Sequence, residues 1–186
     1  MKLDLSNLNV LVDLETLSLR KDAVILSIGA VAFTKDGITD QFYINIDPKS
    51  CEKHGLRTDA GTAEWWTNTA LKSPDTYKAL LHRRVSLPCA LELFDVWYQG
   101  FQFYPSGIWG NSPSFDLDIF ANAFNVVGRE KPWSFGYERD FRTIRNLASS
   151  KPDVQNADWH NALADARYEA EMLIEIFRQL NGTAAQ

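Results

Sequence analysis

Residues Val10–Leu19 read VLVDLETLSL. The overlapping segment Asn9–Glu15 is rich in branched apolar side chains, which predicts a buried strand. Two acids, Asp13 and Glu15, interrupt the apolar run, and side chains two apart on a strand share one face. Adjacent carboxylates repel unless a cation lies between them, which favours a divalent metal with oxygen ligands. A strand that simply runs out into solvent would explain the same two acids.

Further strands and helices are predicted in the rest of the sequence. Strand patterns occur at Ala23–Thr34, Gln41–Ile46 and Ser106–Gly110. Helical patterns occur at Ala63–Leu71, Ser73–Leu81, Ser86–Tyr98, Pro113–Val127, Phe141–Ser149 and Ala162–Leu180. Strands first, with helices mixed in later, predict an α/β sheet flanked by helices. Because we find no repeat, low-complexity tract or long linker, residues 1–186 are expected to form a single domain.

The composition sets limits on the class of protein. Of 186 residues, 45% are hydrophobic, which is enough for one packed core. No apolar run approaches the ~20 residues that span a bilayer, and no signal-peptide pattern is present, so a soluble, cytoplasmic protein without a membrane partner is expected. Cys51 and Cys89 match no zinc or disulfide spacing. The net charge of −5 counts against phosphate binding by basic residues alone. Bound metals would supply the missing positive charge.

Asp116 lies in the segment SPSFDLDIFANAFNVV, where Ser112 and Pro113 mark a helix start. At about 100° per residue, Asp116 falls at the centre of the apolar stripe, whereas Asp118 lies about 200° away and faces solvent. A carboxylate directed at an apolar core must be paired, protonated or bound to a cation. The helix dipole favours acids in a first turn, which explains Asp118 better than Asp116.

The segment HNALADARYEAEMLIEIFRQL predicts a long packing helix with Asn161 as its N-cap. His160 then lies on the loop before the helix, and Asp165 lies early in the helix at the border of its buried face. Each has an ordinary explanation by itself, as a loop histidine and as an acid favoured by the helix dipole. Their interpretation changes only when they are taken together with the three acids above.

Three stretches resemble, in order and spacing, the exonuclease motifs of the DEDDh group within the ribonuclease-H-like superfamily. They are VLVDLETLSL at Val10–Leu19, WGNSPSFDLDIF at Trp109–Phe120 and HNALAD at His160–Asp165. The stretches SIGAVAF, TAEWW and WGNSPSFD followed by KPWSF are similar to a narrower branch with phage exodeoxyribonucleases and a bacterial 3′→5′ exoribonuclease. Ribonuclease T and oligoribonuclease are more distantly similar. The resemblance covers nearly the whole chain and implies a ribonuclease-H-like fold with a mixed sheet.

The resemblance also implies a set of catalytic roles. It makes His160 the general base, and it makes four acids the metal ligands: Asp13, Glu15, Asp116 and Asp165. The implied cofactors are two divalent cations, Mg²⁺ or Mn²⁺, which suit an all-oxygen shell better than zinc does. In many members of the wider group an asparagine lies four residues before the second-motif acid. Here Ser112 holds that place and Asn111 lies one further back, so no role is assigned to Asn111.

The implied activity is 3′→5′ exonucleolytic hydrolysis of single-stranded nucleic acid, with release of nucleoside 5′-monophosphates. DNA is favoured over RNA as the polymer whose 3′ end is bound. By the same resemblance, the backbone at Leu14 and Thr16 and the side chain of Glu15 meet the terminal nucleotide. Leu19 is a candidate wedge against the last base.

Two aromatic segments are candidate surfaces for bases. Trp65 and Trp66 are adjacent on a predicted helix and point about 100° apart, so one is expected inside and one available for stacking. Helix core is the alternative role for both. Residues Arg129–Arg145 (REKPWSFGYERDFRTIR) form the most basic stretch of the chain, interleaved with aromatic residues. This composition suits a single strand, although surface charge over core aromatics explains it equally well.

Three other functions fit the same residues. A non-catalytic nucleic-acid-binding module would keep the fold without hydrolysis. A metal phosphohydrolase limited to short oligonucleotides would use the same site in a more enclosed pocket. A proofreading subunit would work bound to a polymerase, but no dedicated docking segment is evident in the sequence. A homodimer that shares substrate contacts is a further expectation by analogy.

Overall fold

The computed structural model describes residues 5–72, 74–148, 152–155 and 159–183. Its centre is a five-stranded mixed sheet with the strand order β3-β2-β1-β4-β5. The strands are β1 (Asn9–Thr16), β2 (Ile25–Thr34), β3 (Gly37–Asn45), β4 (Ile108–Gly110) and β5 (Glu138–Asp140). The first three pair in antiparallel fashion, while β4 runs parallel to both β1 and β5. The predicted α/β fold with a mixed sheet is confirmed.

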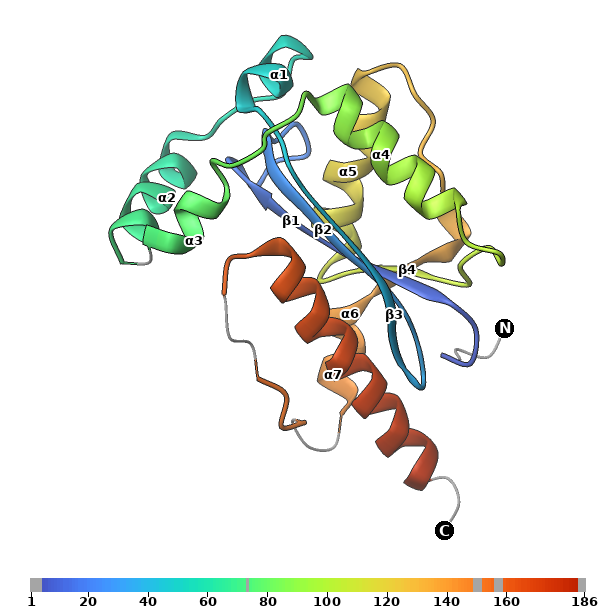
Figure 1. Cartoon of the computed structure of the whole chain (residues 1–186). Coiled ribbons are helices and arrows are strands. Elements are labelled where there is room, and N and C mark those ends of the chain that lie inside the picture. The colour runs from blue at the N-terminus through green and yellow to red at the C-terminus, as the bar shows by residue number, and fades with distance from the viewer. Residues whose placement is uncertain (1–4, 73, 149–151, 156–158, 184–186) are drawn as a thin grey trace.

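Helices lie on both faces of this sheet, and α7 crosses one face diagonally (Figure 1). The helices are α1 (Pro48–Lys53), α2 (Ala60–Lys72), α3 (Pro74–Ala79), α4 (Leu87–Gln99), α5 (Asp118–Val126), α6 (Phe141–Leu147) and α7 (Ala162–Thr183). A π-helical turn, η1 (Pro113–Leu117), precedes α5, and a 3₁₀ turn, η2 (Phe135–Tyr137), precedes β5. Over the described ranges, no helix is long and apolar enough to span a membrane.

Two apolar cores follow from the alternation of side chains along β1. Val10 and Val12 are buried with Phe94 of α4 and Phe120 of α5 on one face. Leu11 is buried on the other face in a second core that includes residues of α6 and α7. Because both faces are covered, the strand needs apolar residues on both sides, which is why Val10, Leu11 and Val12 are apolar without a break.

Several boundaries differ from the sequence-based prediction. Strand β2 starts at Ile25, because Ala23 instead forms an isolated bridge to Arg57. The helix predicted at Pro113–Val127 consists of two pieces, η1 and α5, and Ser112 at its start makes no capping bond through its side chain. Helix α1 and strand β5 contain almost no apolar residues and were not predicted. Ser73 and Ser149, ends of two predicted helices, lie outside the described residues.

Candidate active site

Asp13 and Glu15 lie on the face of β1 that α7 covers. Val12 and Leu14 pack into the core on the α4 and α5 side, whereas Leu11 packs into the core that contains α7. The period of two along a strand therefore directs Asp13 and Glu15 toward α7. Glu15 is buried with 8% of its surface exposed, so the strand does not simply run out into solvent at this position.

The first turn of α7 packs against the sheet beside these acids because Gly29 has no side chain. Gly29 of β2 lies opposite Asp13 in the strand register. A Cβ atom at Gly29 would lie 2.1 Å from the carbonyl carbon of Ala162, the first residue of α7. The Asn161 side chain caps the helix by accepting two backbone N–H bonds, each 3.1 Å, as the sequence predicted. This close approach brings the α7 residue Asp165 over β1.

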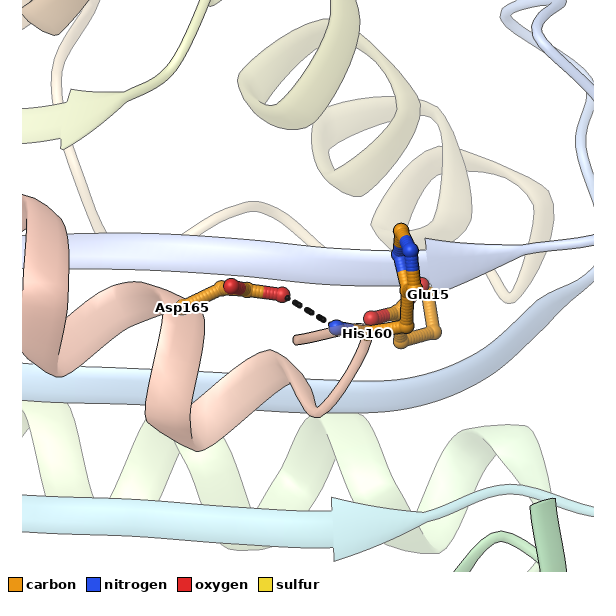
Figure 2. Close-up of side chains that lie close together, drawn as sticks. All are labelled: Glu15, His160 and Asp165. Carbon is orange, nitrogen blue, oxygen red and sulfur yellow. Dashed lines mark hydrogen bonds between the residues drawn. The ribbon is translucent and has the colours of Figure 1, made fainter. Parts of the chain in front are cut away.

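The backbone of His160 is hydrogen-bonded to Asp165 and so fixes the residue beside the acids. Its amide N–H donates a 3.0 Å hydrogen bond to Asp165 Oδ2, and Figure 2 shows its ring beside Glu15. Ligand atoms of Glu15, His160 and Asp165 lie within 4.8 Å of one another. The φ angle of His160 is 68°, a left-handed conformation that costs energy in a non-glycine residue. The imidazole also meets the Trp65 ring edge-on at 4.8 Å between centroids.

Asp116 faces inward from η1, as the helical geometry predicted. Only 1% of its surface is exposed, whereas Asp118 is exposed. The Ser112 amide donates a 3.2 Å bond to Asp116 Oδ2, while Oδ1 is buried and has no hydrogen-bond partner among the described residues. Gly110 at the end of β4 makes room for the side chain, since a Cβ there would lie 2.9 Å from Asp116 Cβ.

The acids of the site destabilise one another's charged forms. Burial raises the pKa of Asp13 well above its ordinary range, and the charges of Asp116 and Glu15 raise it further. Burial also raises the pKa of Glu15 to about 8 and that of Asp116 to about 7. The buried oxygen Oδ1 of Asp116 has no hydrogen-bond partner within the described chain, and the carboxylates cannot all be charged without a positive charge among them. A hard divalent cation with oxygen ligands would satisfy both conditions. The residues therefore fit such a cation.

A fifth acid, Glu169, borders this cluster and was missed in the sequence. It lies one turn after Asp165 on α7 and is 5% exposed. Burial raises its pKa to about 8, and the charge of Asp116 adds to the rise. Asn111 donates its side-chain N–H to Glu169, and the Arg142 guanidinium donates to Asn111 Oδ1 at 3.2 and 3.3 Å. An acid on the apolar face of a helix was the available signal, the same one that singled out Asp116.

The five predicted substrate-binding residues line one pocket, which we call the β1–α2 pocket. Its volume is about 510 Å³, and its lining includes Leu14, Glu15, Thr16, Leu19, Trp65 and Trp66. Trp66 is the inner tryptophan, 3% exposed, and its indole N–H donates to the Thr16 carbonyl at 2.9 Å. Trp65 is 44% exposed and Leu19 is 77% exposed, so both offer apolar surface at the pocket. The expectation of one inner and one available tryptophan agrees with this arrangement.

The basic and aromatic stretch Arg129–Arg145 contributes aromatic residues to the core and basic residues to the surface. Trp133 and Phe141 are core residues, and the Lys131 ammonium is paired with Glu138. Arg145, in contrast, has an exposed side chain on α6, and its guanidinium lies 5.6 Å from the centre of the Phe141 ring.

Comparison with known protein families identifies the family of this chain. The family model described as the Rv2179c-like 3′-5′ exoribonuclease domain matches residues 8–177. The chain belongs to this family. The match includes all four predicted metal-binding acids and His160, and it makes the protein a nuclease of the hydrolase class. Comparison with curated protein sequences gives no match.

Solved structures with the same fold include three nucleases. The nuclease domain of 3′hExo, a DEDDh family member bound to rAMP, is 12% identical with a TM-score of 0.66, covering 94% of this chain and 93% of that one. E. coli ExoI in a zinc-bound complex with single-stranded DNA is 13% identical with a TM-score of 0.65; 94% of this chain matches 41% of that longer chain. Cell-death related nuclease 4 is 12% identical, with a TM-score of 0.53 and coverage of 94% and 65%. At these identities the likeness concerns the ribonuclease-H-like fold.

Proposed function

We propose that the protein removes nucleotides from the 3′ end of single-stranded RNA and releases nucleoside 5′-monophosphates. The observation that carries this proposal is the convergence of Glu15, His160 and Asp165 beside the β1–α2 pocket, with the buried Asp116 behind them. The sequence alone favoured DNA. Membership of a family described as exoribonuclease domains now favours RNA.

The acids would hold the metals, and His160 would move the proton. Asp13, Glu15, Asp116 and Asp165 are the proposed ligands of two divalent cations, Mg²⁺ or Mn²⁺, which when bound would neutralise the phosphodiester and favour attack by water. His160 accepts the proton of the attacking water. Water oxygen then bonds to phosphorus as the bond to the 3′ oxygen of the preceding nucleotide breaks. The products are a 5′-monophosphate and a strand shorter by one residue with a new 3′ hydroxyl.

The β1–α2 pocket would select the terminal nucleotide. The exposed faces of Trp65 and Leu19 offer apolar contact to a base without reading its identity. The Thr16 hydroxyl donates to the Ser18 carbonyl at 2.7 Å, so its oxygen remains an acceptor beside the pocket. A ribose 2′ hydroxyl is a donor as well as an acceptor, and this chemical difference is how a protein separates RNA from DNA.

The test compares RNA and DNA of identical sequence, as dimers and as strands of about 20 nucleotides, with Mg²⁺ and with Mn²⁺. Chromatography of the products should show nucleoside 5′-monophosphates from the long RNA, formed faster than from the DNA. Faster release of nucleotides from DNA would show that DNA is the preferred substrate, as the sequence alone favoured. Hydrolysis of the dimers alone would identify a short-oligonucleotide phosphohydrolase, and tight binding without any hydrolysis would identify a non-catalytic module.

A further inference from the structure

A second pocket opens on the side of the acid cluster away from β1 and α2. It lies between the end of β4, helix α6 and helix α7, and we call it the α6–α7 pocket. Its volume is about 500 Å³, within the ~300–1,000 Å³ typical of ligand sites. The lining residues that matter here are Asn111, Arg145, Trp159, Tyr168 and Glu169.

The inner wall of this pocket adjoins the acid cluster directly. Asn111 follows the last residue of β4 and donates to Glu169, which closes the wall between β4 and α7. Glu169 lies one helical turn beyond Asp165 on the same helix, and Trp159 precedes His160 in the chain. Each pocket is therefore lined by one acid of the cluster, the β1–α2 pocket by Glu15 and the α6–α7 pocket by Glu169.

The outer part of the pocket has the chemistry of a nucleotide site. Arg145 presents an exposed guanidinium, whose planar fork suits a phosphate. Trp159 is 56% exposed, and its ring lies 5.3 Å from that of Tyr168 between centroids, which makes an aromatic surface on which a base can stack. The pocket's acid, Glu169, is buried: Asn111 donates to one of its oxygens, and the other has no hydrogen-bond partner in the part of the chain that the structure describes. The nearby charge of Arg145 acts to lower the pKa of Glu169, so the pocket holds one exposed cation beside one buried acid.

We propose that the α6–α7 pocket binds the nucleotide on the 5′ side of the scissile phosphate, with Arg145 on a backbone phosphate and Trp159 against the base. This assignment rests on the proposed exonuclease function, since a terminal nucleotide in the β1–α2 pocket leaves the preceding nucleotide on the other side of the acids. It also gives a role to the end of the basic and aromatic stretch Arg129–Arg145.

The test separates this subsite from the chemistry by using two substrates. Uridine 5′-monophosphate p-nitrophenyl ester, a ribonucleotide substrate, has a nucleotide to fill the β1–α2 pocket but no nucleotide on the other side of its phosphodiester. A trinucleotide fills both pockets. For Arg145→Ala and Trp159→Ala we expect KM for the trinucleotide to rise about tenfold, with kcat/KM for the ester unchanged. Arg145→Lys should recover part of the loss, because it keeps the charge without the fork.

Arg178→Ala is the matched control, since this arginine is exposed at the far end of α7 and pairs with Glu175. It should change neither substrate's kinetics. Equal losses on the ester and the trinucleotide for Arg145→Ala would show a structural role and overturn the subsite, as would unchanged kinetics on both. If the unmodified protein cleaves neither substrate, the proposed function fails as well, and the two failures are thereby distinguished.

Discussion

The backbone amide of His160 donates a 3.0 Å hydrogen bond to Asp165 Oδ2, so one carboxylate both belongs to the acid cluster and holds the loop that carries the proposed base. The backbone of His160 is left-handed, with φ at 68°, and its ring also contacts the Trp65 ring edge-on. Folding of the first turn of α7 and placement of the base are therefore coupled.

Replacing His160 by alanine should remove the general base and leave the acids in place. We expect kcat on a single-stranded oligonucleotide to fall by about 10²–10⁴-fold. KM should change little, because the β1–α2 pocket is retained. His82→Ala, at an exposed position after α3, is the control and should behave as the unmodified protein. A loss of less than about threefold in His160→Ala would rule out its role as base.

Asp116→Asn should abolish activity and increase the stability of the metal-free protein. The amide keeps the shape of the side chain but removes a buried charge that repels Asp13. We expect Mg²⁺-dependent hydrolysis to be lost, while the Tm in EDTA at about pH 8 rises by about 2–4 °C, the shift expected from ~1 kcal/mol in a chain of this size. The exposed neighbour in Asp118→Asn should alter neither quantity. A lower Tm for Asp116→Asn in EDTA would contradict the repulsion inferred here.

Metal-free stability should decrease as the pH rises. Glu15 and Glu169 have folded-state pKa values of about 8, above the ~4.3 of an unfolded glutamate. Between these values the folded protein binds protons that the unfolded chain has released, so the free energy of unfolding falls with rising pH. Thermal scans in EDTA from about pH 5 to 8.5 measure this slope, and Glu169→Gln should flatten it more than the exposed Glu130→Gln.

Added Mg²⁺ should oppose this trend. Because cation and protons compete for the same carboxylates, Mg²⁺ should raise the Tm more at about pH 8 than at about pH 5.5. An equal Mg²⁺ effect at both values would indicate that the ion binds elsewhere on the protein.

The two adjacent tryptophans should give opposite phenotypes. Trp66→Ala removes a buried ring and its bond to Thr16, so we expect a loss of about 3–5 kcal/mol in the free energy of unfolding. Trp65→Ala removes exposed surface, so we expect a small change in stability and a KM about tenfold higher for an oligonucleotide. Denaturant unfolding and steady-state kinetics on both variants measure the difference. Equal KM values for Trp65→Ala and the unmodified protein would remove this residue from the substrate surface.

Local periodicity was sufficient to predict the strands and helices whose apolar patterns repeat. It also identified the inward direction of Asp116, although this residue lies in the π-helical turn η1, because Asp116 is only two residues before α5 and the difference in rotation per residue stays small over that distance. Helix α1 (PKSCEK) and strand β5 (ERD) escaped prediction because they contain almost no apolar residues and so show no apolar pattern. The role of Gly29 depends on a contact with Ala162, and a contact between distant segments leaves no trace in local sequence.

The acid cluster was only partly visible in the sequence. Asp13 and Glu15 were evident from their repulsion, whereas Asp165 depended on the family resemblance. Glu169 was overlooked because its position was interpreted only as part of a packing helix, although an acid on a buried face calls for an explanation. Its partner Asn111 lies about 60 residues away in the sequence, and only folding brings them together.

The most direct test of the central claim is digestion of a 5′-labelled single-stranded RNA with Mg²⁺, by the unmodified protein and by Asp13→Asn. We expect a ladder of labelled fragments that shorten one nucleotide at a time from the 3′ end, seen only with the unmodified protein. Direct release of a labelled mononucleotide without intermediate fragments, internal cuts, or an identical ladder from Asp13→Asn would contradict a 3′→5′ exonuclease built on these acids.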